Sequence, residues 1–218
     1  MKLPDTPDAF GPPVAHPLVA VAARAAHRAG VPRVLLAGAG SGRHIAPLLT
    51  ANVAIDAIEP DAARANGLAE RFASDDRVRV ASASLAGPYP FAERYGAVLS
   101  THALLHGRAA SVGGAIAALG ALLVPGGAFV ATLGSQQDRR FGDGRRLDAR
   151  TFAPQDGEEV DVPHAFFDEA DVRVLFAAFA LETLDETDAS DAVGRWAHEP
   201  HASRGFVHWF AVARRSTI

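Results

Sequence analysis

The sequence predicts a single α/β domain built on a doubly wound, mostly parallel sheet with helices on both faces. Short apolar segments alternate with helical ones through most of the chain, and a glycine-rich segment directly follows the first apolar one. The chain has 218 residues, and 49% of them are hydrophobic. This length and composition suffice for one sizeable hydrophobic core, but the chain is short for two independent domains. We therefore expect residues 1–218 to form one domain.

An N-terminal helical segment is expected over residues 1–32, because apolar residues from His16 to Ala29 recur at helical spacing. Residues 33–134 then alternate between strand and helix periods. Strands are predicted at Arg33–Ala37, Val53–Ile58, Arg77–Ala83, Ala97–Thr101 and Ala128–Leu133, and helices at Arg43–Leu49, Asp61–Phe72 and Ala109–Leu123. Five strands joined by right-handed helical crossovers predict a largely parallel sheet.

The second half of the chain is less regular. Periodicity is lost from Gly134 to Pro163, where Gly, Asp, Arg and Gln dominate, so we expect residues 135–164 to form a long loop that acts as a lid. Residues 165–218 are expected to hold a C-terminal helix and then two strands, Leu181–Leu184 and Phe206–Ala213. Because no helix separates these two strands, they are predicted to pair antiparallel.

Composition excludes several classes of protein. The formal net charge is -4 and basic residues form no block, which argues against a nucleic-acid partner. The absence of cysteine excludes disulfides, thiolate metal sites and thiol nucleophiles. An uncharged run from Ala109 to Gln137 is long enough for a membrane span, but Pro125-Gly126-Gly127 interrupts it, so a buried helix, a turn and a strand are expected instead. We expect a cytoplasmic protein with no secretory signal and no membrane partner.

The glycine-rich segment is the strongest functional signal. Gly38, Gly40 and Gly42 stand between a buried strand and a helix, where glycines permit a sharp turn and the close approach of a ligand. We expect residues 33–134 to be a cofactor-binding core, with a purely structural turn as the alternative. Glu59 ends the next strand, seventeen residues beyond Gly42, where doubly wound folds place an acid against a ribose. A solvated acid at a strand end is the alternative for Glu59.

A nicotinamide-binding fold would share these glycines and this acid, but its pattern requires a third glycine at position 43, where this chain has Arg43. The chain instead resembles the class I S-adenosylmethionine-dependent methyltransferases. The resemblance rests on VLLAGAGSGRH at residues 34–44, IEPD at 58–61, STHALLHG at 100–107 and LVPGGAFV at 123–130.

This resemblance implies a seven-stranded sheet, S-adenosylmethionine as the cofactor, S-adenosylhomocysteine as its product, and methyl transfer to a small-molecule acceptor. The implied cofactor-binding residues lie in the glycine loop and at the ends of the second, third and fourth strands: Gly38, Ala39, Gly40, Ser41, Gly42, Glu59, Pro60, Ser82, Ala83, Ser84, Leu85, Ser100 and Thr101.

The chain departs from the family pattern at three places where acids are usual. Leu36 stands where a carboxylate normally helps to hold the cofactor's amino group, Ser82 and Ser84 replace an acid near the adenine, and Tyr95-Gly96 replaces Phe-Asp. Leu36 is the most consequential of these. It leaves open a non-catalytic protein that binds an adenosyl ligand or a partner, and, as a third alternative, a nicotinamide-dependent oxidoreductase.

Three histidines are candidate acid–base groups: His102 and His106, just after the fourth strand, and His164, after the expected loop. A structural role is an equal alternative for each, and no metal is expected because no third ligand is patterned near them. On the acceptor side we expect Arg139, Arg140, Phe141 and His164 to bind the substrate, with a solvated mixed-charge loop as the alternative. No motif in the sequence identifies the acceptor.

Overall fold

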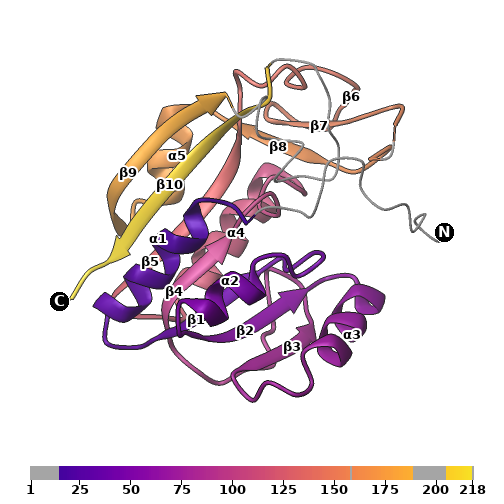
Figure 1. The fold of residues 1–218 in the computed structure, drawn as a ribbon. Coiled ribbons are helices and arrows are strands. Elements are labelled where there is room, and N and C mark those ends of the chain that lie inside the picture. Colours follow the sequence, from indigo (N-terminus) through magenta and orange to yellow (C-terminus); the bar gives the residue numbers. More distant parts are fainter. Residues whose placement is uncertain (1–14, 158, 189–204, 218) are drawn as a thin grey trace.

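A twisted sheet with helices on both faces forms the body of the molecule (Figure 1). In the computed structural model, which describes residues 15–157, 159–188 and 205–217, seven strands lie in the order β3-β2-β1-β4-β5-β10-β9. The first five are parallel, and β10 is antiparallel to both β5 and β9. Their bounds are β1 Arg33–Ala37, β2 Ala54–Glu59, β3 Val78–Ser82, β4 Tyr95–Ser100, β5 Leu123–Ser135, β9 Phe179–Asp188 and β10 Val207–Arg215. The predicted fold class is confirmed.

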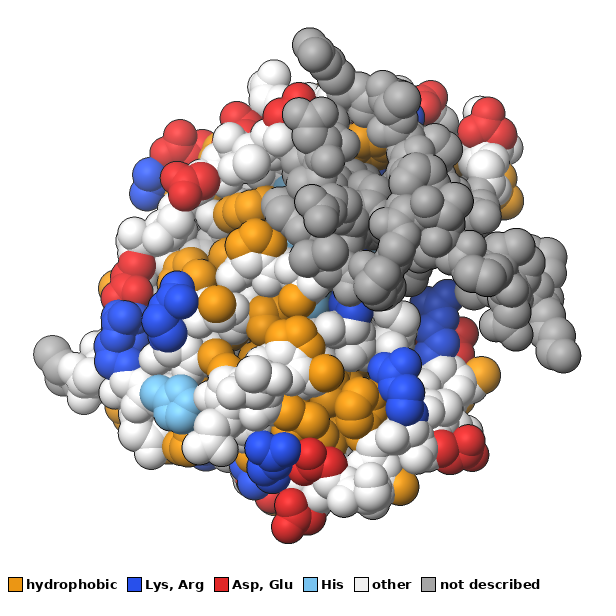
Figure 2. Space-filling model, in the orientation of Figure 1, with side chains coloured by type: hydrophobic (Ala, Val, Ile, Leu, Met, Phe, Trp, Pro, Cys, Tyr) orange, Lys and Arg blue, Asp and Glu red, His pale blue; other side chains and the backbone are white. Residues whose placement is uncertain are grey.

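The helices form two layers. Helices α1 (Leu18–Arg28), α2 (Ile45–Thr50) and α3 (Ala62–Arg71) contribute to one apolar cluster, and α4 (Ala109–Gly120) and α5 (Glu169–Leu175) contribute to the other. Figure 2 shows the face that carries α1 and α2, where apolar side chains gather across the middle and charged side chains lie at the edge. Among the described residues, no helix is long and apolar enough to cross a bilayer.

Close packing between α1 and β4 explains one departure from the family pattern. A Cβ atom on Gly96 would lie 2.2 Å from the Val31 carbonyl oxygen and 2.7 Å from the Ala26 Cα, both of them main-chain atoms. All six residues of β4 are buried, as expected for a parallel strand covered on both faces. A side chain larger than hydrogen at position 96 would push α1 off the sheet.

The segment expected to form a long loop, residues 135–164, is mostly irregular but is more ordered than the sequence predicts. This segment contains two short strands, β6 (Arg145–Arg146) and β7 (Thr151–Ala153). Strand β6 pairs antiparallel with β7, and β7 pairs antiparallel with β8 (His164–Phe167). Strand β8 continues the sheet beside the end of β5, so over the described residues the sheet has ten strands, three more than the seven expected. Edge-to-face contacts among Phe141, Phe152 and Phe166 fix the segment against the domain.

Strand β5 also starts earlier than predicted. The Pro125-Gly126-Gly127 segment lies inside it as a bulge, because the pairing with β4 jumps from Tyr95↔Leu123 to Ala97↔Ala128. Gly126 has a φ of 76°, which favours glycine at that position.

A buried carboxylate joins four of the five parallel strands. Asp56 on β2 is fully buried and accepts two hydrogen bonds of 2.6 Å from Arg79 on β3, one of 3.2 Å from Arg33 on β1, and one of 2.9 Å from the Tyr95 hydroxyl on β4. The charge is therefore completely partnered where it leaves water.

We predict that Asp56→Ala lowers the free energy of unfolding by about 2–3 kcal/mol, because the buried Tyr95 hydroxyl loses its acceptor, Arg33 loses its partner and Arg79 keeps only its ion pair with Glu93. Asp75→Ala is the matched control, because Asp75 also forms an ion pair with an arginine, Arg77, but at the protein surface. Urea denaturation should show a much larger loss for Asp56→Ala than for Asp75→Ala. Equal losses would show that burial adds nothing to the Asp56 pairs.

Candidate functional site

The glycine loop joins the end of β1 to α2, and its three glycines serve different purposes. Gly38, Gly40 and Gly42 have φ values of 80°, 54° and 76°. A Cβ on Gly38 would lie 2.3 Å from the Ala103 Cβ, and one on Gly42 would lie 2.4 Å from side-chain atoms of both Arg71 and Leu68. A Cβ on Gly40 would meet nothing within 4 Å. Packing therefore explains two of the glycines, and only Gly40 borders open space.

Glu59 fastens this loop to the end of β2. Its side chain is largely buried, and its two carboxylate oxygens accept hydrogen bonds from the main-chain N–H groups of Gly40, at 2.8 Å, and Asp61, at 3.1 Å. Asp61 in turn caps α3 by accepting from the Arg64 N–H. Each carboxylate oxygen keeps a further lone pair that can accept from a ligand hydroxyl.

The end of β3 lies next to Glu59, as the sequence predicts. The Ala83 N–H donates to the Glu59 carbonyl oxygen at 3.2 Å, so residues 82–85 follow the same edge of the sheet. Ser82 and Ser84 are exposed, and Leu85 packs partly buried against the core. Pro60 is also on this edge, 3.5 Å from the Ser82 hydroxyl through its carbonyl oxygen.

The two residues at the end of β4 differ in what their hydroxyls do. Ser100 is fully buried and donates to the Ala37 carbonyl oxygen at 2.9 Å, so its hydroxyl ties β4 to β1. The Thr101 hydroxyl is buried and, among the described residues, has no hydrogen-bond partner. Because Ala103 contacts Gly38, the segment after β4 lies directly against the glycine loop.

His102 belongs to a group of buried histidines that the sequence did not bring together. The histidine cluster consists of His16, His44, His102 and His208, which come from the residues before α1, the start of α2, the segment after β4, and β10. The His102 ring lies 5.6 Å from the His16 ring and 5.1 Å from the His208 ring, centroid to centroid. No spacing in the sequence signals a contact between residues so far apart along the chain.

Burial keeps the histidine cluster neutral. It lowers the pKa of His16 and His44 to about 3, with a further contribution from the positive charge of Arg43. It lowers the pKa of His208 to about 4, assisted by Arg140, and holds the pKa of His102 well below its usual value. At neutral pH these imidazoles are unprotonated on at least one nitrogen and can accept a proton or a hydrogen bond.

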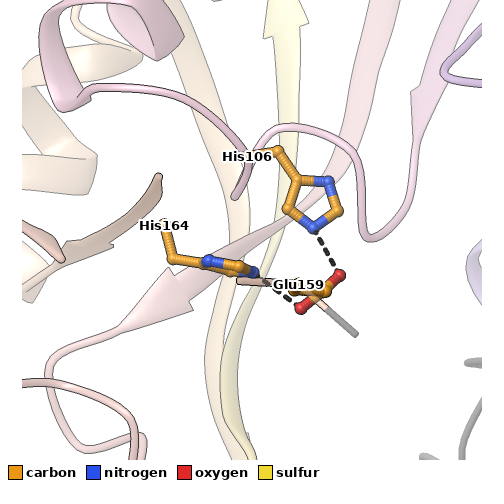
Figure 3. Close-up of side chains that lie close together, drawn as sticks. All are labelled: His106, Glu159 and His164. Carbon is orange, nitrogen blue, oxygen red and sulfur yellow. Dashed lines mark hydrogen bonds and ion pairs between the residues drawn. The ribbon is translucent and has the colours of Figure 1, made fainter. Parts of the chain in front are cut away.

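The other two candidate histidines lie in a separate group with Glu159. His106 and His164 form an isolated β-bridge, and both Nε2 atoms approach the Glu159 carboxylate (Figure 3). Hydrogen bonding to these two imidazoles holds the pKa of Glu159 well below its usual range. We call His106, Glu159 and His164 the His-Glu-His triad. Glu159 was not singled out in the sequence, because a lone acid in a mixed-charge segment gives no signal.

The expected acceptor-side residues occupy three different environments. Arg140 is paired with the buried Asp138 at 2.9 and 3.1 Å, and it also lies 3.4 Å from His208 Nε2. The guanidinium of Arg139 lies 4.7 Å from the centre of the Phe206 ring. Phe141 packs edge to face against Phe152 on β7 and Phe166 on β8. Arg140 is thus the residue that connects this segment to the histidine cluster.

Comparison of the sequence with protein-family models and with curated proteins finds no match, whereas comparison with solved structures finds many. The 1,6-didemethyltoxoflavin-N1-methyltransferase of Burkholderia thailandensis, crystallised with 1,6-didemethyltoxoflavin and S-adenosylhomocysteine, matches with a TM-score of 0.64 and 22% identity over 92% of this chain and 77% of that chain. The CcbJ methyltransferase of Streptomyces caelestis gives 0.65 and 18% over 98% and 100%. The N-methyltransferase NodS of Bradyrhizobium japonicum, in complex with S-adenosylhomocysteine, gives 0.60 and 17% over 90% and 85%. The chain has the class I methyltransferase fold.

Within this methyltransferase fold, Leu36 is a core residue. Its side chain is completely buried, in the apolar cluster that also contains α1 and α2 residues, and its strand neighbours are Ala57 and Leu99. A carboxylate at position 36 would be buried among apolar side chains. The packing of this apolar cluster therefore explains why position 36 is a leucine and not an acid.

The neutral histidine cluster predicts how stability depends on pH. Below its ordinary pKa of 6.5 an unfolded histidine takes up a proton, whereas the folded one does so only near pH 3 to 4, so the folded state loses stability as pH falls. We expect a loss of roughly 1 kcal/mol per pH unit for each of these histidines between pH 6.5 and about 4.5, above the range in which carboxylates titrate.

Denaturation at a series of pH values checks this. His208→Gln should flatten the slope, because it removes one titrating group from the unfolded chain. A wild-type profile that is level from pH 7 to about 5 would contradict the assignment of these four imidazoles as neutral.

Proposed function

We propose that this protein transfers a methyl group from S-adenosylmethionine to a small-molecule acceptor. The observation that carries the proposal is the open space at Gly40, between two glycines that packing already explains. This space adjoins the Glu59 carboxylate, because the Gly40 N–H donates to it. A left-handed glycine beside a buried carboxylate suits a ligand that crosses the loop and presents hydroxyl groups, as the ribose of an adenosyl cofactor does.

The residues around this space fit the rest of such a cofactor. Pro60 and residues 82–85 lie on the same edge as Glu59 and would border the adenine. Thr101, next to the glycine loop, would meet the methionine portion with its unused hydroxyl. Because Leu36 is part of the core, the amino group would be held by main-chain carbonyls of the loop or by Thr101 in place of an acid.

In this proposal the histidine cluster supplies the group that takes a proton from the acceptor. S-adenosylmethionine, when bound, provides an electrophilic methyl group on a sulfonium, and the in-line transfer requires an acceptor that is positioned and shielded from water. His102 follows β4 beside the glycine loop, and burial keeps its ring neutral. We assign it the task of accepting a proton from the acceptor, because its segment lies next to the glycine loop and its ring is unprotonated on at least one nitrogen.

Residues 135–164 are proposed as the outer wall of the acceptor site. Arg140 places this segment against His208, but its charge is balanced by Asp138, so it serves to position the wall. Arg139 remains the better candidate for contact with an anionic acceptor, while Phe141 anchors the segment from within. His164 belongs to the His-Glu-His triad, a second place where an acceptor could be held.

Isothermal titration with S-adenosylmethionine, S-adenosylhomocysteine and NADPH tests the proposal. We expect the two adenosyl ligands to bind and NADPH not to. Binding of NADPH alone would favour an oxidoreductase, and adenosyl binding without transfer to any nucleophile in an acceptor screen would favour a non-catalytic protein.

Gly40→Val should reduce affinity for S-adenosylhomocysteine by at least about 100-fold, because the added side chain fills the space the ligand needs. Gly30→Val is the matched control. Gly30 also has a positive φ, 72°, and open space around its Cβ position, but it lies in the turn between α1 and β1. Both variants bear the same backbone strain, so only a ligand at Gly40 separates them. Equal affinities in the two folded variants would show that the glycine loop does not contact the ligand.

Glu59→Ala should weaken S-adenosylhomocysteine by about 1.5–3 kcal/mol, the scale of a hydrogen bond to a charged group. The carboxylate also holds Gly40 and Asp61, so part of any loss comes from the loop. Titration of a 2′,3′-dideoxy analogue separates the two effects, since it lacks the hydroxyls and should lose much less affinity on the same substitution. Equal losses for both ligands would mean that Glu59 acts on the loop alone.

A further inference from the structure

Three side chains from separate segments converge in the His-Glu-His triad (Figure 3). His106 lies in the segment between β4 and α4, Glu159 lies between β7 and β8, and His164 begins β8. Glu159 carboxylate oxygens lie 3.2 Å from His106 Nε2 and 2.9 Å from His164 Nε2. The ligand atoms of all three residues lie within 4.8 Å of one another.

The protonation of His164 makes this convergence informative. Its Nδ1 lies 2.9 Å from the Val162 carbonyl oxygen, which can only accept, so Nδ1 carries a hydrogen. In the neutral ring Nε2 is then bare, and it faces a carboxylate oxygen of Glu159 that is also only an acceptor. Two lone pairs at that distance repel each other. A proton held between the two atoms relieves this repulsion, and so does a cation bound by both.

Several features favour a cation. A histidine that binds a metal commonly donates its other N–H to a carbonyl or carboxylate, as His164 does to Val162. A tetrahedral shell with bonds of about 2.0–2.1 Å places neighbouring ligand atoms about 3.3 Å apart. The two imidazole nitrogens lie 3.2 and 2.9 Å from different oxygens of Glu159, and one ligand atom from each residue lies within 4.8 Å of the other two, so small side-chain rotations bring the three to that spacing. The side chains of His106 and Glu159 are 40% and 49% exposed, so an ion can enter and keep a position open to solvent, while His164 is 2% exposed and fixed.

We propose that the His-Glu-His triad is a binding site for a divalent first-row transition-metal cation, with Zn²⁺ as the representative. Two imidazoles and one carboxylate, with a further position open, form a ligand set that such cations take. The sequence predicted no metal because no third ligand is patterned near the histidines. The fold supplies Glu159, 53 residues from His106 and five from His164. The metal proposal does not rest on the proposed methyl transfer, since its observations come from His106, Glu159 and His164 and none of these belongs to the glycine loop or to the histidine cluster.

Titration of untagged, metal-stripped, full-length protein with ZnCl₂ tests the proposal. We expect about one Zn²⁺ per chain, and Co²⁺ in its place should give the absorption bands of a tetrahedral site. Glu159→Gln should weaken Zn²⁺ more than about 100-fold, beyond the 10–100-fold typical of an outer-shell partner. Because Glu159 is exposed, this variant should fold normally, which circular dichroism would verify. His106→Gln, at the other exposed ligand, should weaken Zn²⁺ in the same way.

Two control variants locate the ion. His27→Gln removes a surface histidine, and His208→Gln removes a member of the histidine cluster. Both should bind Zn²⁺ as the wild type does. If no stoichiometric Zn²⁺ binds, if Glu159→Gln binds it unchanged, or if His208→Gln abolishes binding, the triad is a hydrogen-bonded tether with a doubly protonated His164, and the proposal is overturned.

Discussion

The candidate site depends on the hydrogen bonds that the Glu59 carboxylate accepts from the main chain. Pairing between β1 and β2 ends at Ala37↔Ile58, so Glu59 is the first residue beyond it and reaches the turn that follows β1. There it accepts from Gly40 on one side and Asp61 on the other. The main-chain N–H groups at the two strand ends thereby share one buried anion, which satisfies groups that would otherwise lack partners. The shape of the glycine loop, the start of α3 and the open space at Gly40 all follow from this arrangement.

Much of the fold could be predicted because its signals are local and repeated. The bounds of β1 agree with the prediction, and the antiparallel pair β9–β10 was found from the absence of a helix between two apolar segments. Strands β6 and β7 were missed because two or three residues show no period, especially among Gly, Asp and Arg. The loop residues of the site could be found because they are contiguous. The histidine cluster and Glu159 could not, because contacts between distant segments leave no spacing to measure.

Two departures from the methyltransferase pattern have one physical cause. Gly96 is required because main-chain atoms of Ala26 and Val31 lie against β4. Leu36 lies in the apolar cluster to which α1 contributes six residues. When a helix approaches a sheet this closely, an acid on the covered face has neither water nor a partner, and its burial is costly. The polar side chains of Glu59 and Thr101 lie instead at the ends of β2 and β4, outside this apolar layer.

Histidine performs two different tasks in this molecule, and the neighbouring charges decide which. In the histidine cluster the rings are buried beside Arg43, which lowers their pKa values. The rings therefore stay neutral, and each keeps a nitrogen lone pair. In the His-Glu-His triad the two rings share an anion and two of the three side chains reach solvent, so positive charge is stabilised and can be exchanged. The segment after β4 contributes one residue to each group, His102 and His106, only four positions apart. Strand β8 and the residues before it complete the triad, because they bring His164 and Glu159 to His106.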